Sequence, residues 1–237
     1  MQTIERRIRL QKFMAQSGVC SRRKAETYIL ERRVRVNNKV ITTPGTKIDP
    51  INDTVIFDKK KVTLRPGTEN IYIALNKPEG YISSCSRKHG KIILDLVKVE
   101  KRIFPVGRLD KNSKGLILLT NDGALHHRLS HPSFNHEKEY IVKTRQPISD
   151  NALNRMASGM IIDKVALRRT CVSRIDANSF MIVLKQGINR QIRKMVKQAG
   201  NQVDSLLRTR IADIRLGQLK QGCWRRLSAK EMKSLSQ

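Results

Sequence analysis

Residues 107–123 read GRLDKNSKGLILLTNDG, and this stretch decides how the rest of the chain is interpreted. Apolar runs that end at Val106 and begin at Leu116 predict two strands, and the polar, Gly-bounded segment between them predicts a loop. The loop carries a single carboxylate, Asp110, among several cations. Such a group can serve as a nucleophile, a general base or a metal ligand. A turn residue or a salt-bridged surface acid explains it about equally well from the residues alone.

The composition points to a polyanionic partner. The chain has 237 residues, and 48 Lys+Arg against 20 Asp+Glu give a formal net charge of +28. Such an excess of positive charge favours nucleic acid as the binding partner. The alternative is a basic protein that does not bind nucleic acid. An anionic membrane is disfavoured, because the sequence has neither an apolar run of about 18 residues nor a basic amphipathic anchor.

The cysteines and histidines do not predict a metal site. The four cysteines stand far apart without CxxC spacing, which argues against zinc and against a disulfide framework. His126, His127, His131 and His136 are close in sequence but lack accompanying acids or thiols at ligand spacing, so we expect no metal. The N-terminal residues show no apolar secretion signal, which predicts a cytoplasmic protein.

Residues 8–57 predict a unit of two helices followed by a hairpin. Ser21 is a suitable N-cap for the second helix, which we expect to reach Arg32, and Asn37-Asn38 marks a tight turn between short strands. A further strand is expected over 48–57, and the polar segment 59–70 is expected to be a linker. Cations in the first turn of the second helix oppose its dipole, so a phosphate partner explains them better than helix stability does. A solvated charged face is the alternative.

The segment RLQKFMAQSGVCSRRKAETYILERRVRVNNKVI resembles the S4 RNA-binding domain. The resemblance implies a domain over residues 7–66 that contacts RNA through exposed cations. The residues that it implies for this contact are Lys12, Arg22, Arg23, Lys24 and Arg35.

Residues 70–237 predict a second domain of many strands and few helices, so the expected class is α+β with a mixed, mainly antiparallel sheet. The clearest helix is predicted over 189–199, with Asn189 as its N-cap. Its apolar stripe is Ile192, Met195, Val196 and Ala199. Arg190, Arg193, Lys194 and Lys197 share the other face, and no acid between Lys185 and Asp204 offsets them. A nearby anion or a merely solvated face would explain these cations.

Four segments in this order resemble the pseudouridine synthases of the RsuA type: VGRLDKNSKGLILLTNDG, HEKEY, GINRQIRKM and VDSLLRTRI. The resemblance implies a site-specific isomerase that converts uridine to pseudouridine in ribosomal RNA, without a cofactor or a metal. Asp110 matches the catalytic nucleophile, Tyr140 the tyrosine that stacks on the flipped base, and Arg193 the basic residue that pairs with the aspartate. We therefore expect the Arg193 guanidinium within ion-pair reach of Asp110, with Tyr140 beside them.

The remaining expectations concern the substrate and its partners. The predicted substrate-binding residues are Arg108, Leu109, Lys111, Asn189, Arg190, Gln191 and Leu206. The expected substrate is 23S rRNA, and the alternatives are 16S rRNA, a tRNA anticodon loop, or a non-catalytic role as an S4 ribosome-assembly factor. A flipped-out uridine is required because the reacting atoms are inaccessible inside a base stack. We expect a monomer that does not bind membranes.

Overall fold

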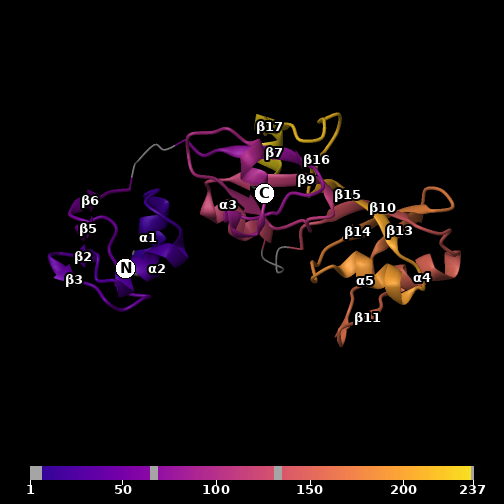
Figure 1. The fold of residues 1–237 in the computed structure, drawn as a ribbon, viewed down its shortest axis with the longest axis horizontal. Coiled ribbons are helices and arrows are strands. Elements are labelled where there is room, and N and C mark those ends of the chain that lie inside the picture. The colour runs from indigo at the N-terminus through magenta and orange to yellow at the C-terminus, as the bar shows by residue number, and fades with distance from the viewer. Residues whose placement is uncertain (1–6, 65–68, 131–134, 236–237) are drawn as a thin grey trace, which may run out of the picture. The chain divides into compact units, whose positions relative to one another are not determined.

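The chain divides into two compact units, one ending at Glu69 and one beginning at Asn70 (Figure 1). A computed structural model describes residues 7–64, 69–130 and 135–235. Each unit has its own hydrophobic core, and each combines helices with sheets whose strand pairs are mostly antiparallel. The predicted α+β class is confirmed.

The first unit packs two helices on small sheets. Its elements are β1 (Ile8–Arg9), α1 (Leu10–Gln16), α2 (Arg22–Leu30), β2 (Val34–Val36), β3 (Lys39–Val40), β4 (Lys47–Ile48), β5 (Val55–Phe57) and β6 (Lys60–Val62). The strands form a pair β1–β4 and a four-stranded sheet ordered β3-β2-β5-β6. Ser21 caps α2 by accepting a hydrogen bond from the Lys24 amide, as predicted. Asn37 and Asn38 both have positive φ in the β2–β3 turn, which is the conformation that such a hairpin needs.

Two expectations for this unit were wrong. The predicted strand over 48–57 is interrupted, because the Asp49 carboxylate accepts the Ile51 and Asn52 amides and turns the chain. The start of the predicted linker is the strand β6, which pairs with β5 through a two-residue turn at Asp58-Lys59, both with positive φ. Residues 65–68 of the predicted linker lie outside the described residues.

The second unit is built on a nine-stranded sheet with the order β13-β14-β10-β15-β9-β7-β17, with β16 pairing with β15 and β8 with β9. Its strands are β7 (Tyr72–Lys77), β8 (Phe104–Val106), β9 (Lys114–Thr120), β10 (Lys138–Thr144), β13 (Cys171–Arg174), β14 (Ser179–Leu184), β15 (Val203–Ile211), β16 (Ile214–Arg215) and β17 (Trp224–Arg226). Its helices are η1 (Arg87–His89), η2 (Ile93–Leu96), α3 (Gly123–Ser130), α4 (Asp150–Ser158), α5 (Gln191–Gln198) and α6 (Ala229–Ser234). Among these described strands, β9 and β15 make the one parallel pair.

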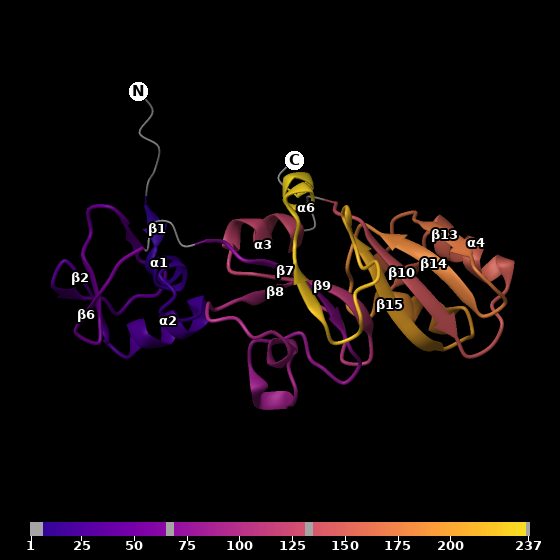
Figure 2. The same cartoon turned by 90° about the horizontal axis from the view of Figure 1, so that it is seen from above.

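The helices of this unit cover the two ends of the sheet separately. Figure 2 shows α4 beside β13 and β14 at one end, and α3 and α6 near β7, β8 and β9 at the other. Separate apolar clusters underlie them, one from β10, β14, α4 and α5 and two on opposite faces of β7 and β9. The parallel pair β9–β15 joins these two halves. Because β15 also pairs with β10, the β9–β15 pair brings residues 107–113, the loop before β9, close to both strands.

Helix α5 differs from expectation in its start and in its charge balance. It begins at Gln191, and Arg190, with φ 55°, occupies the cap position without a side-chain cap, so Asn189 is not the N-cap. The apolar stripe is confirmed, since Ile192, Met195 and Val196 are buried and Ala199 is half-buried against the same core.

An acid does offset one cation of α5. Asp163 forms an ion pair with Lys194. It lies in the turn between β11 (Ile161–Ile162) and β12 (Val165–Ala166), which pair as a hairpin. Sequence distance concealed this pairing, because the hairpin lies beside α5 only in the folded chain.

Candidate active site

A cavity of about 440 Å³ lies in the second unit and collects the predicted site residues. Asp110 from the loop before β9, Tyr140 from β10 and Arg193 from α5 all line it. Six of the seven predicted substrate-binding residues line it as well: Arg108, Leu109, Asn189, Arg190, Gln191 and Leu206. Lys111 does not line the cavity, and its side chain is exposed. Four segments distant in sequence therefore meet in one pocket.

The charge of the cavity is strongly one-sided. Among the described residues that line it, Asp110 is the only acid, whereas the cations are Arg108, Lys138, Lys185, Arg190, Arg193 and Arg208. Such a lining attracts an anionic ligand such as RNA.

The Asp110 loop is fixed by its own backbone, since every carbonyl from Arg108 to Ser113 accepts a hydrogen bond. The donors are Arg208 to Arg108 (3.4 Å), Ser83 to Leu109 (2.9 Å), the Ser113 amide to Asp110 (3.1 Å), the Gly80 amide to Lys111 (2.9 Å), Arg193 to Asn112 (2.7 Å) and Lys77 to Ser113 (2.6 Å). Ser83 Oγ also accepts the Leu109 amide at 3.1 Å. These hydrogen bonds hold in one position the backbone from which the Asp110 side chain extends.

The predicted ion pair between Arg193 and Asp110 was wrong. No described cation lies within 4.0 Å of the Asp110 carboxylate. The Arg193 guanidinium instead donates to the carbonyls of Asn112 and Val203, at 2.7 and 3.4 Å. Burial lowers the pKa of Arg193, Arg190 lowers it further, and the charge of Asp110 opposes them. Arg193 thus contacts the backbone of the Asp110 loop, and its charge interacts with that of Asp110 without direct contact.

Lys77 is a buried charge below the loop that the sequence did not reveal. Its side chain is fully buried, and Nζ donates to the carbonyls of Pro78, Lys111 and Ser113. Burial lowers the pKa of Lys77 to about 8, although Glu79 and Asp110 raise it. Nothing in the segment Asn76-Lys77-Pro78 distinguishes Lys77 from the other 47 Lys and Arg residues of the chain.

Gly115 allows the strands on either side of the site to approach. It has φ +106°, and a Cβ at this position would lie 2.7 Å from the Arg208 amide nitrogen and closer still to the Arg208 carbonyl oxygen. Real Cβ atoms essentially never approach so closely, so the β9–β15 pairing at this point needs glycine. The second Gly of GRLDKNSKG is therefore a packing residue.

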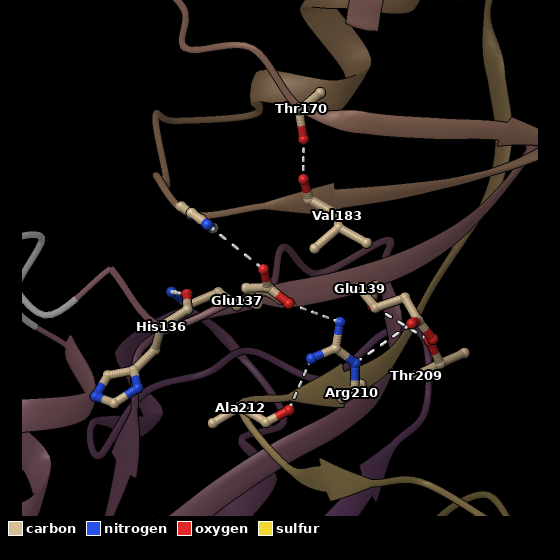
Figure 3. Close-up of polar contacts among 10 residues, drawn as sticks. His136, Glu137, Glu139, Thr170, Val183, Thr209, Arg210 and Ala212 are labelled. Atoms are coloured by element: carbon tan, nitrogen blue, oxygen red, sulfur yellow. Dashed lines mark hydrogen bonds and ion pairs between the residues drawn. The ribbon is translucent and has the colours of Figure 1, made fainter.

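The two glutamates of HEKEY hold β10 to β15. Figure 3 shows the Arg210 guanidinium between them, with Nη2 3.1 Å from Glu137 and Nε 3.3 Å from Glu139. The hydroxyl of Thr209 donates to Glu139 at 2.6 Å, and these contacts, with that of Thr209 the largest, lower the pKa of Glu139. In the same view, the Thr170 hydroxyl contacts the Val183 carbonyl. Both glutamates are already engaged, so they are not further candidates for the acid in the cavity.

The first unit displays its predicted RNA-binding cations at the surface. Arg22, Arg23, Lys24 and Arg35 are exposed, and Lys12 is half-buried. Lys24 Nζ lies 4.8 Å from the centroid of the Tyr28 ring, and the Arg33 guanidinium lies 4.3 Å from the same centroid. These cations stand on α1, α2 and β2 of one small unit.

The histidine segment shows no metal site in the residues described. No group of three or more His, Cys, Asp or Glu side chains in these residues is placed to hold an ion. His136 lines the cavity, and burial followed by Lys138 and Arg128 lowers its pKa. His131 lies outside the described residues.

None of the helices that the structure describes has the length and apolar content needed to cross a membrane.

Comparison with known proteins agrees with this site. Residues 71–198 match the RNA pseudouridylate synthase family, and residues 8–55 match the S4 domain. The chain is 39% identical over 225 residues to the dual-specificity RNA pseudouridine synthase RluF of Escherichia coli O6:H1, which covers 95% of this chain and 77% of that protein. It is 36% identical over 235 residues to an uncharacterized RNA pseudouridine synthase of Aquifex aeolicus, covering 96% and 93% of the two chains.

A solved structure extends the agreement to the fold. A crystal structure of a pseudouridylate synthase superposes with a TM-score of 0.71 at 28% identity, covering 96% of this chain and 99% of the other. The family match spans the Asp110 loop, β10 and α5, which contribute Asp110, Tyr140 and Arg193 to the cavity. The chain therefore belongs to the RNA pseudouridylate synthase family, and it is an isomerase that forms pseudouridine from uridine in RNA.

Proposed function

We propose that Asp110 is the nucleophile of this reaction, that Tyr140 stacks on the flipped-out uracil and that Arg193 orients the Asp110 loop. The supporting observation is that these three side chains line one cavity, and that no other acid lines it in the part of the chain that the structure describes. In the isomerisation the bond from C1′ to N1 breaks and a bond from C1′ to C5 forms. The proton leaves C5 and N1 gains one, so neither water nor an oxidant is consumed. A nucleophile and a positioned base are sufficient for such chemistry.

The proposed substrate is 23S rRNA, bound by both units. Residues 70–237 would act on the uridine, and residues 7–66 would supply a second, phosphate-directed contact through Lys12, Arg22, Arg23, Lys24 and Arg35. A tethered second contact raises overall affinity by effective concentration. We place the protein in the cytoplasm as a monomer that needs neither a cofactor nor a metal.

The test of the chemistry is the Asp110→Asn variant. It should bind rRNA as the wild type does but form no pseudouridine, because an amide cannot act as the nucleophile. Asp204→Asn is the matched control, since Asp204 is an exposed acid on β15 outside the cavity. Pseudouridine formed by Asp110→Asn at the wild-type rate would overturn the assignment.

The target is identified by treating rRNA and tRNA from cells with and without the gene with a carbodiimide, which marks pseudouridine. Primer extension then maps the marked positions as reverse-transcription stops. We expect one reverse-transcription stop in 23S rRNA to depend on the gene. A dependent stop in 16S rRNA or in a tRNA anticodon loop, with 23S unchanged, would contradict the proposed target. Identical maps in all RNAs would favour a non-catalytic assembly factor.

A further inference from the structure

Arg208 is a buried cation in the wall of the cavity that has no acidic partner. Its exposed fraction is 2%, and it lines the cavity from β15. Within the part of the chain that the structure describes, no carboxylate lies within 4.0 Å of its guanidinium. Burying an unpaired charge is costly, so such a residue calls for a specific explanation.

The hydrogen bonds of Arg208 explain part of its placement. Nε donates to the Leu116 carbonyl at 2.6 Å, and Nη1 donates to the Arg108 carbonyl at 3.4 Å. These two carbonyls lie on either side of Asp110, one before it and one at the start of β9. Arg208 therefore holds both ends of the segment that carries the proposed nucleophile.

The third nitrogen of the guanidinium is left without a partner. Nη2 is buried and donates to no described group, although each Arg carries five donor hydrogens in a planar fork. A buried donor without an acceptor is destabilising in the empty protein. It becomes favourable if an oxygen of a ligand reaches it.

The surroundings of Arg208 indicate which oxygen this is. Arg208 is the cross-strand neighbour of Tyr140, and its guanidinium lies 6.0 Å from the Tyr140 ring centroid. Two exposed cations of the cavity, Arg108 and Arg190, are placed to meet phosphates, and the third, Lys185, pairs with Glu137 at 3.6 Å. A buried donor beside the ring that would stack on the base meets the part of the nucleotide that enters deepest, which is the base itself.

We infer that Arg208 contacts the substrate, with Nη2 donating a hydrogen bond to a carbonyl oxygen of the flipped uracil while Nε and Nη1 hold the Asp110 segment. The inference rests on the proposed function of this cavity. A contact with O4 would also supply a basis for specificity, because cytosine has an amino group at C4 that cannot accept from a guanidinium, whereas the C2 carbonyl is common to both bases.

The test combines Arg208→Lys with two modified substrates. The RNA is the 23S rRNA fragment that contains the uridine identified by sequencing, made with uridine, 2-thiouridine or 4-thiouridine at that position. Sulfur is a weaker hydrogen-bond acceptor than oxygen. The wild type should therefore convert one of the two thio substrates about ten- to a hundredfold more slowly than it converts uridine, as expected for the loss of one charge-assisted hydrogen bond. Arg208→Lys should convert the uridine RNA more slowly than the wild type does. Replacing uridine by that thio substrate should slow this variant little further.

Comparison of the two enzymes removes the intrinsic effect of sulfur on reactivity. Arg210→Lys is the matched control, because Arg210 lies two residues along β15, is held by Glu137 and Glu139 and does not line the cavity. It should keep the full wild-type sensitivity to the thio substrate. The fluorescence of the single Trp224 checks that each variant is folded.

Three outcomes would contradict the inference. A wild type that converts both thio substrates as fast as uridine would overturn it without any variant. Equal slowing of wild type and Arg208→Lys by each thio substitution would overturn it while leaving the proposed function intact. A wild type that forms no pseudouridine from the uridine RNA would overturn the proposed function and this inference with it.

Discussion

Replacing Gly115 by Ala should disrupt the junction on which the active site depends. The new Cβ would lie 2.7 Å from the Arg208 amide nitrogen, about 0.7 Å short of the 3.4 Å at which ordinary contact begins. Ala at φ +106° adds backbone strain of about 1–3 kcal/mol. Forcing the β9 and β15 backbones apart adds about 1–3 kcal/mol more, by analogy with overpacked cores. The expected loss in the free energy of unfolding is therefore about 2–6 kcal/mol.

Gly90→Ala is the matched control for the strain alone. Gly90 has φ +115°, and a Cβ there would meet nothing within 4 Å. It should lose only the strain contribution of about 1–3 kcal/mol. Urea unfolding followed by Trp224 fluorescence reports on the correct unit, because β17 pairs with β7 and β7 with β9.

Activity gives the second measurement for Gly115→Ala. A shift of the order of 1 Å at β9 and β15 displaces the Asp110 loop relative to Tyr140, and misplacement of this size costs about a hundredfold in rate. The reasoning is refuted if Gly115→Ala unfolds at the same urea concentration as Gly90→Ala and forms pseudouridine at the wild-type rate.

Two further predictions concern pH. Between about pH 8 and pH 10.5 the folded chain releases the Lys77 proton while the unfolded chain keeps it, so the Lys77 contribution to the free energy of unfolding rises with pH across this window. Lys77→Met should remove that rise, and an unchanged slope in urea unfolding at several pH values would contradict it. Arg225 and the Ser228 amide lower the pKa of Glu231 to about 2, so this carboxylate stabilises the fold above its ordinary pKa of 4.5, and that stabilisation is lost as pH falls toward 2. The stability difference between wild type and Glu231→Gln should therefore shrink over that range, and a difference that stays constant would contradict the assignment.

The sequence by itself determined the local elements around the Asp110 loop and displayed the motifs, although the strand over 48–57 and the start of α5 were predicted wrongly. Apolar runs on both sides of residues 107–113 fixed the strands around the Asp110 loop, and the stripe of Ile192, Met195 and Val196 fixed the buried face of α5. These features depend on periodicity over a few residues, which a sequence displays directly. The α+β class followed from the same patterns.

Only the tertiary structure decided how the site is held. The carbonyls of the Asp110 loop are bound by side chains far away in sequence, with separations of 26 residues for Ser83, 36 for Lys77 and 81 for Arg193. Arg208 reaches the Leu116 carbonyl across 92 residues. Such contacts depend on sheet order and strand register, which local patterns leave open. The expectation that Arg193 pairs with Asp110 came from the family resemblance, whereas in the fold Arg193 donates to the Asn112 carbonyl of the loop that carries Asp110.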